Sequence, residues 1–256
     1  MVYYQPSPLS EFDLTLMAKI DRLYTAHPFY GAPRITKHLN KLDKIIVNHK
    51  KIERLMGLMG IQAIYPQKKR QTSQANPEHR KFPYLLNGVK ANRPDLIWGT
   101  DITYIRANQD WFYLVALMDW FSRYVLSWRL SKSLSTDFCV LNLEQGLKIS
   151  QPIIHNSDQG SQFTADDYIK VLQRHSSIKI SMDGRGRCFD NIFNERLWRT
   201  VKYEEVYLKD YRSFDEAEES LAQYFQFYNT VRLHSSLNDQ TPEQVYFQRS
   251  KSVSSN

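Results

Sequence analysis

Residues 96–131, LIWGTDITYIRANQDWFYLVALMDWFSRYVLSWRLS, decide the fold class of this chain of 256 residues. Three runs within the stretch, at 96–106, 111–121 and 124–131, are rich in aromatic and β-branched residues and predict β-strands. The breaks between the runs are short enough for hairpins, so the three strands should be antiparallel neighbours.

Helix and strand signals alternate after this stretch. Three antiparallel strands followed by alternating helix and strand predict an α/β fold, a ribonuclease-H-like mixed sheet with helices on its faces. The predicted elements are helices at 135–148, at 164–174 (Thr164 with Asp167 as its cap), at 189–205, at 213–228 (Ser213 with Glu216) and from Thr241 and Pro242 onward, and strands at 152–156 and 178–182.

The chain before this stretch has a different character. Residues 10–60 carry three runs with apolar residues at helical spacing, and Ser10 with Asp13 indicates the first helix start. We expect a small all-α, helix-turn-helix-like DNA-binding module at 10–64, a basic linker at 65–92 and a catalytic core with C-terminal helices at 93–250. An ordinary helical bundle with solvated charges is the alternative for the module. The cations expected to contact DNA there are Arg34, Lys37, Lys50, Lys51 and Arg54.

Charge is distributed unevenly along the chain. Residues 1–95 contain 16 Lys and Arg against 7 Asp and Glu, a net +9, whereas residues 96–256 contain 18 against 20, a net −2. A basic front and a back half with spare carboxylates fit a DNA-binding part joined to a cation-binding part. Cys139 and Cys188 are too few and too far apart for a zinc site or a disulfide framework, which favours a reducing, intracellular location. No apolar stretch approaches the length of a membrane span.

Two aspartates fall at strand positions where chemistry is expected. Asp101 interrupts the first predicted strand, where a carboxylate is unfavourable unless a partner or a metal ion compensates for it, or unless it lies on a solvated face. Asp158 follows the predicted strand at 152–156, at the end where α/β proteins place their sites; a turn residue before Gly160 is the alternative.

Glu195 supplies a third carboxylate from the helix predicted at 189–205. Asn191, Arg199 and Lys202 share its helix face and could bind DNA phosphates, although an ordinary salt-bridged surface helix has the same spacing. The three carboxylates can converge at one edge of a ribonuclease-H-like sheet. Oxygen ligands suit Mg²⁺ or Mn²⁺, and two such ions would support an in-line attack on a phosphodiester.

These residues resemble the DDE transposases of bacterial insertion sequences, in particular the second-frame product, OrfB, of the IS-three family, whose cores are similar to retroviral integrases. The resemblance covers nearly the whole chain. The family has about thirty-five residues between its second Asp and its Glu, and this chain has 36 between Asp158 and Glu195; Lys202 matches the basic residue seven positions after the Glu. The motifs are residues 98–101 (WGTD), 157–163 (SDQGSQF), 190–202 and 228–237 (YNTVRLHSSL).

The resemblance implies an enzyme that cleaves and joins DNA strands, with Asp101, Asp158 and Glu195 as its catalytic metal ligands. It implies DNA partners (terminal inverted repeats and target DNA), a homo-oligomer on DNA, a first-frame OrfA protein as partner or fusion, no membrane, and a cytoplasmic, nucleoid-associated location in bacteria. A ribonuclease-H-like nuclease that does not join strands and a non-catalytic DNA-binding regulator are the alternatives.

Three further residues have weaker signals. His155 stands three residues before Asp158, whereas many relatives have a histidine two before, so we expect no catalytic part for it. Asp119 is expected to belong to a hairpin with Ser122 and Arg123. Asp183 is expected to touch DNA or nothing.

Overall fold

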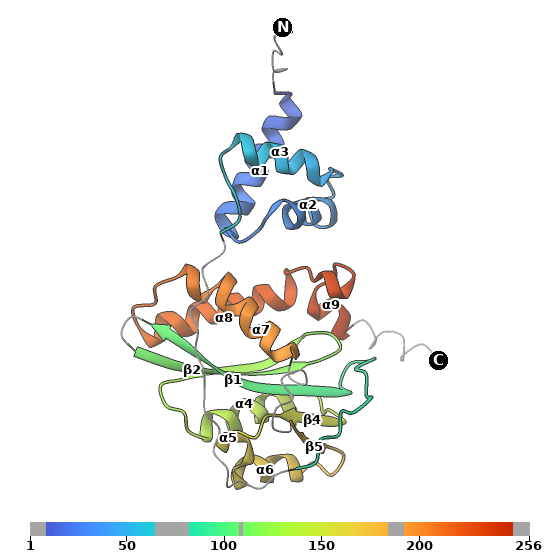
Figure 1. Ribbon diagram of the computed structural model, residues 1–256, viewed down its shortest axis with the longest axis vertical. Coiled ribbons are helices and arrows are strands. Elements are labelled where there is room, and N and C mark those ends of the chain that lie inside the picture. The colour runs from blue at the N-terminus through green and yellow to red at the C-terminus, as the bar shows by residue number, and fades with distance from the viewer. Residues whose placement is uncertain (1–8, 65–81, 108–109, 184–191, 248–256) are drawn as a thin grey trace. The chain divides into compact units, whose positions relative to one another are not determined.

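The computed structural model describes residues 9–64, 82–107, 110–183 and 192–247. Contacts divide the chain into two compact units, residues 1–67 (the helical unit) and 68–256 (the sheet unit), shown in Figure 1. Much of the predicted linker and the predicted DNA-contacting Asn191 lie outside the described residues. No helix among the described residues is long and apolar enough to cross a bilayer.

The helical unit contains the three helices predicted from apolar spacing: α1 (Glu11–Ala26), α2 (Ala32–Lys41) and α3 (His49–Leu58). The Ser10 hydroxyl accepts a hydrogen bond from the Asp13 backbone N–H at 3.1 Å, which confirms the predicted cap and satisfies one of the free donors of the first turn. A small core of Leu16, Ile20, Ile35, Leu39, Ile52 and Leu55 joins the helices.

The sheet unit is built on five strands in the order β3-β2-β1-β4-β5. The first three, β1 (Ile97–Ala107), β2 (Asp110–Asp119) and β3 (Val125–Ser131), are antiparallel, as their short connections predict. β4 (Ile154–Ser157) pairs in parallel with β1, and β5 (Lys179–Met182) pairs in parallel with β4. The mixed sheet confirms the predicted fold class.

Helices cover both faces of this sheet (Figure 1). Alternate residues of β2 divide between the two cores: Leu114 and Met118 belong to one cluster, and Val115 and Leu117 to the other. The first cluster includes residues of α7 (Ile192–Glu204) and α8 (Phe214–Thr230), and the second includes residues of α4 (Asp137–Leu147) and α6 (Asp166–Gln173). Because side chains alternate along a strand, a residue of β1 is committed to one of these two environments.

One predicted helix start is wrong. Thr164 does not cap α6, whose N-cap is Ala165; it ends the short helix α5 (Ser161–Thr164), and its hydroxyl donates to the Gly160 carbonyl at 3.0 Å. The cap predicted at Ser213 is confirmed, because its hydroxyl accepts from the backbone N–H of Glu216, and the last helix begins at Pro242 as predicted, with the Thr241 hydroxyl accepting from the Gln244 backbone N–H. The remaining elements are η1 (Val206–Leu208), η2 (Ser235–Leu237) and α9 (Pro242–Phe247).

A buried ion pair ties the end of α7 to the segment after α8. Arg232 donates to both carboxylate oxygens of Glu204, from Nε and from one terminal nitrogen, at 2.7 Å each. The Tyr224 hydroxyl donates to Glu204 at 3.0 Å, and a second terminal nitrogen of Arg232 lies 3.0 Å from Nε2 of His234. All four side chains are buried. The geometry is bidentate, so each charge is compensated inside the protein.

We expect Arg232→Met to lower the free energy of unfolding by about 3–5 kcal/mol, because it leaves the Glu204 carboxylate buried without its partner. The double variant Arg232→Met/Glu204→Leu should recover much of that loss, since neither charge is then buried alone. Urea unfolding at neutral pH measures both. A double variant as unstable as the single one would show that packing, and not charge, holds this region.

Candidate active site

Asp101 and Asp158 are brought together by the parallel pairing of β1 with β4. The register pairs Gly99 with Asn156, and each aspartate lies two residues further along its own chain direction. Asp101 is still within β1 and Asp158 is the first residue after β4, and the negative charge of Asp158 is the second-largest cause of the raised pKa of Asp101. The structure therefore places the two predicted carboxylates next to each other.

The Asp101 carboxylate is oriented by two donors. Trp198 of α7 donates from Nε1 to Oδ2 at 2.9 Å, and the Ile102 backbone N–H donates to Oδ1 at 2.8 Å. Burial raises the pKa of Asp101, the negative charge of Asp158 raises it further, these two hydrogen bonds lower it, and Glu195 raises it again, to about 7. Asp101 thus stands in a site that disfavours its own negative charge.

Asp158 lies just past β4 at the surface. Its Oδ1 accepts from the Gly160 backbone N–H at 2.9 Å, which lowers its pKa, but the protein packed around it has the larger effect and raises the pKa. Glu195 lies in the first turn of α7 and is exposed. Its negative charge contributes to the raised pKa of Asp101, but less than burial and Asp158 do.

Lys202 is the cation beside this group. It is half-buried on α7, where desolvation lowers its pKa and the negative Asp101 raises it. The two acids that could have paired with it have other partners: Glu204 binds Arg232, and Glu205 lies 3.0 Å from Nζ of Lys209. The charge of Lys202 therefore interacts with Asp101, and neither neighbouring acid forms an ion pair with it among the described residues.

The donor set suits a hard divalent cation. Asp101 and Asp158 offer carboxylate oxygens, and a cation between them would remove their mutual repulsion. Across the residues that the structure describes, no three His, Cys, Asp or Glu side chains lie close enough together to hold one metal ion. Among the described residues, Asp101, Asp158 and Glu195 are therefore not close enough together to form one complete metal site.

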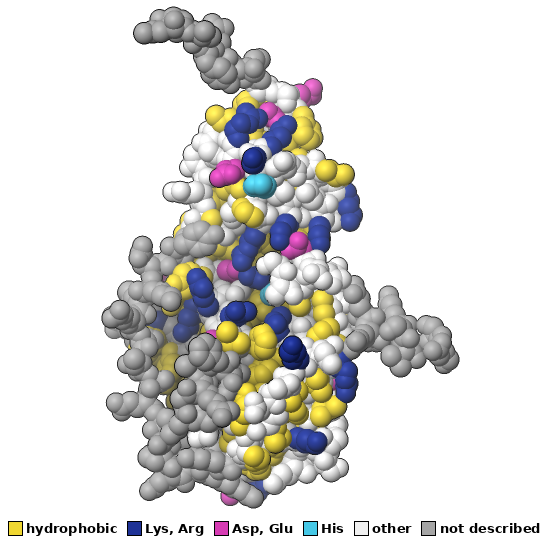
Figure 2. All heavy atoms as spheres, turned by 45° about the vertical axis from the view of Figure 1, so that its right-hand side comes forward, with side chains coloured by type: hydrophobic (Ala, Val, Ile, Leu, Met, Phe, Trp, Pro, Cys, Tyr) yellow, Lys and Arg dark blue, Asp and Glu magenta, His cyan; other side chains and the backbone are white. Residues whose placement is uncertain are grey.

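The remaining cations predicted to contact DNA have different surroundings. Arg199 is exposed on α7, with its guanidinium 5.6 Å from the ring centroid of Tyr203. In the helical unit, Arg34 stacks over Tyr30 at 5.7 Å, Lys37 is half-buried, and Lys50 is exposed on α3. Figure 2 shows Lys and Arg side chains on the surface of both units.

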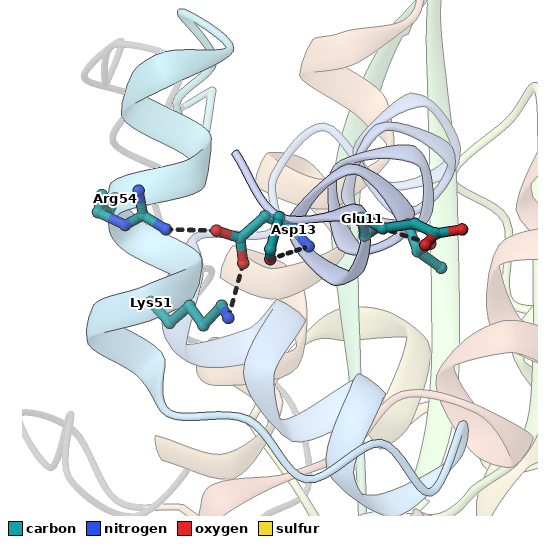
Figure 3. A network of polar contacts seen from close by, with 6 residues as sticks. Glu11, Asp13, Lys51 and Arg54 are labelled. Carbon is teal, nitrogen blue, oxygen red and sulfur yellow. Dashed lines mark hydrogen bonds and ion pairs between the residues drawn. The ribbon is translucent and has the colours of Figure 1, made fainter. Parts of the chain in front are cut away.

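Lys51 and Arg54 are both engaged by an acid that the sequence analysis treated only as a capping partner. Asp13 of α1 lies 2.6 Å from Nζ of Lys51 and 2.9 Å from a terminal nitrogen of Arg54, both on α3 (Figure 3). The hydrogen bond to Lys51 contributes most to lowering the pKa of Asp13. These two cations therefore hold α1 and α3 together, and part of their charge is already compensated.

Asp119, Asp183 and His155, the three residues with weaker sequence signals, each have a local contact that accounts for their position. Asp119 accepts from the Ser122 backbone N–H at 2.7 Å and from its hydroxyl at 2.6 Å, as expected for a hairpin turn. His155 is fully buried beside the Tyr168 hydroxyl at 3.0 Å, and burial lowers its pKa to about 3. The expectation for Asp183 is wrong: it is buried and accepts from the Asn156 side-chain amide at 3.0 Å.

Trp198 is the site residue that the sequence analysis missed. Its signal was available, because it stands three residues after Glu195 and therefore on the same side of the helix. An aromatic residue at that spacing is usually a core residue, and Trp198 is buried in the core as well. Its second role is visible only in the hydrogen bond that its indole N–H donates to the Asp101 carboxylate.

Comparisons with known families match the organisation of the chain. Residues 91–188 and residues 176–242 each match a family described as "Integrase core domain", and residues 11–69 match one described as "HTH-like domain". The two compact units thus correspond to two kinds of domain.

Curated relatives match over most of their length. A putative transposase InsK for insertion sequence element IS150 from Escherichia coli K12 is 31% identical over 94% of this chain and 86% of that protein. Transposase InsF for insertion sequence IS3A, also from Escherichia coli K12, is 28% identical over 84% of this chain and 76% of its own.

Solved structures share the fold at lower identity. The HTLV-2 integrase catalytic core domain, solved in complex with magnesium, is 19% identical with a TM-score of 0.50, over 61% of this chain and 99% of that one. A simian T-cell lymphotropic virus intasome chain is 15% identical with a TM-score of 0.54, over 89% and 74%. The chain has a helix-turn-helix-like unit followed in sequence by an integrase-like core, and it is similar to insertion-sequence transposases over most of its length. It therefore belongs to the IS-three family of transposases.

Proposed function

We propose that this protein cleaves DNA strands at the ends of an insertion sequence and joins them to target DNA, using Asp101, Asp158 and Glu195 as metal-binding catalytic residues. The observation that carries the proposal is that Asp101 of β1 lies close enough to Asp158, at the end of β4, for the charge of Asp158 and burial to raise the pKa of Asp101 to about 7, with a further contribution from Glu195 on α7. Carboxylates with strongly perturbed pKa values are typical of functional sites.

The proposal for Mg²⁺ or Mn²⁺, as two ions, rests on the oxygen donors and on the magnesium complex of the integrase core with the same fold. Asp101, Asp158 and Glu195 would hold such ions, whose chemistry when bound would be activation of the water or 3′-hydroxyl nucleophile and stabilisation of the leaving oxygen. The chain's own residues set the geometry. Trp198 and the Ile102 N–H fix the Asp101 oxygens, and the Gly160 N–H fixes one oxygen of Asp158.

DNA is the proposed partner of both units. In the sheet unit, Lys202 and Arg199 lie on the helix that carries Glu195, so a phosphate held by them would lie next to the carboxylates. Asn191 belongs to the same proposal. In the helical unit, the candidates are Arg34, Lys37, Lys50, Lys51 and Arg54, and the family description of residues 11–69 supports a DNA-binding role. A homo-oligomer on DNA and an OrfA partner are also part of the proposal.

A nuclease that cuts without joining would use the same carboxylates. A strand-transfer assay with the element's own end DNA and a target plasmid separates the two functions. Cleavage with no joined product would favour the nuclease, and binding with no cleavage would favour the non-catalytic regulator.

We expect Asp101→Asn, Asp158→Asn and Glu195→Gln each to reduce strand cleavage by roughly 10³-fold or more, because residues that act as one site fail together. DNA binding should remain near that of the parent protein. The matched control is Asp167→Asn, an exposed acid on α6 that pairs only loosely with Lys170 at 3.4 Å. Cleavage near the parent rate in any one of the three would remove that residue from the site.

Asp101→Asn has a second expected effect. Its folded pKa is raised, so the charged form costs stability at every pH above the usual carboxylate range. The metal-free variant should therefore melt at or above the Tm of the parent at pH 8, and the difference should shrink as the pH falls below about 7 and Asp101 takes up its proton. A variant that melts well below the parent at pH 8 would contradict this electrostatic account.

We expect Lys202→Ala to weaken binding of the element's end DNA roughly tenfold, the size of one charge-assisted phosphate contact. Lys209→Ala is the control, because Lys209 is a nearby exposed lysine paired with Glu205. Filter binding at fixed salt, with Tm measured in parallel, compares them. If the two variants bind DNA equally well, Lys202 has no phosphate role.

We expect Lys50→Ala to reduce the slope of log binding constant against log salt by roughly one, because one phosphate contact and its released counterion are lost. Lys50 is exposed, so Tm should not change. An unchanged slope would place DNA on another face of the helical unit.

A further inference from the structure

Gly99 of β1 lies two residues before Asp101, where the strand meets two side chains from elsewhere in the fold. A Cβ added to Gly99 would lie 2.1 Å from Nε1 of Trp120 and 2.7 Å from Oδ1 of Asn194. Neither distance is compatible with a methyl group. Glycine is therefore needed here for close approach, which explains why a residue with low strand preference stands inside a buried strand.

Trp120 and Asn194 are joined to each other above this glycine. Nε1 of Trp120 donates to Oδ1 of Asn194 at 3.1 Å, and both side chains are buried. The backbone N–H of Trp120 donates to the Ile97 carbonyl at 3.0 Å, so Trp120 is also fixed to β1. A single residue thus links the strand that carries Asp101 to the residue immediately before Glu195.

The turn that follows Trp120 adds a second contact to the same helix end. The Arg123 guanidinium lies 3.8 Å from the ring centroid of Phe193, and the Trp120 ring lies 5.2 Å from it. Arg123 has a positive φ of 64°, a conformation that costs energy for a residue with a side chain. Asp119 stabilises the turn through its bonds to Ser122 and by accepting from the Asp95 backbone N–H at 2.9 Å.

We propose that Trp120, seated on Gly99, is a positioning residue that sets the place of Glu195 relative to Asp101. The inference rests on the proposed role of Glu195 as a metal ligand. Gly99 and Asp101 share one face of β1, and Asn194 and Glu195 are neighbours in the first turn of α7. A shift of the Trp120–Asn194 contact therefore moves Glu195 with respect to Asp101, and metal ligands tolerate little displacement.

The test compares two variants with a control. Trp120→Phe keeps the ring against Phe193 but removes the N–H, and Gly99→Ala pushes the pair away from β1. Trp111→Phe, an exposed tryptophan at the start of β2, controls for loss of an indole. Mn²⁺ binding to each full-length protein is followed by the electron paramagnetic resonance signal of free Mn²⁺, and the Mg²⁺ concentration for half-maximal strand cleavage is measured alongside Tm.

We expect Trp120→Phe and Gly99→Ala to weaken Mn²⁺ binding and to raise the required Mg²⁺ concentration by about tenfold, as removal of groups that orient metal ligands does. The control should match the parent protein. If Gly99→Ala does not fold, Trp120→Phe decides. A lower Tm with parental Mn²⁺ affinity would show that Trp120 is only a core residue and would overturn the inference. A parent protein that binds no Mn²⁺ would instead overturn the proposed function.

Discussion

The hydrogen bonds that pair β1 with β4 in parallel set Asp101 and Asp158 side by side, and this placement has an electrostatic cost. Each aspartate lies two residues past the paired Gly99 and Asn156, so the register brings the two carboxylates to the same end of this strand pair. Burial and the neighbouring charge raise the pKa of Asp101 to about 7. The sheet tolerates this cost because it is packed on both faces, and a one-residue register slip would move each side chain of the slipped strand into the opposite core.

The third carboxylate comes from a helix, and a helix is fixed less directly than a neighbouring strand. α7 is tied down at its far end by Glu204, which binds Arg232 and Tyr224, and along its length by Leu197 and Val201 in the core. The segment after α8 therefore serves the site although it lies far from Asp101 in the sequence. This gives a physical reason for the buried arginine in the motif at 228–237: it holds the helix that carries Glu195.

The parts of the fold that could be predicted from sequence are those with a local cause. The three antiparallel strands follow from short breaks and β-branched runs, and Ser10 and Ser213 follow from capping chemistry. Thr164 was wrongly predicted as a cap because its hydroxyl donates to the Gly160 carbonyl within the short helix α5. A capping pattern in the sequence cannot distinguish this bond from an N-cap bond to the next helix. Trp198 was missed because its spacing also suits a core residue. Contacts between residues about a hundred positions apart leave no local signal.

The same limit applies to charge. The front of the chain carries a net +9, yet formal charge does not show which cations can reach a phosphate. Asp13 binds Lys51 and Arg54 at the contact of α1 with α3, so one acid uses two of the five cations predicted to face DNA. A cation that already has an anionic partner must exchange that partner for a phosphate when DNA binds. It therefore contributes less binding free energy than a cation without such a partner. Lys50, adjacent in sequence but exposed on α3, has no such exchange to make within the described residues. Position on the helix, and not the number of charges, therefore decides how strongly each cation of the helical unit can contribute to DNA binding.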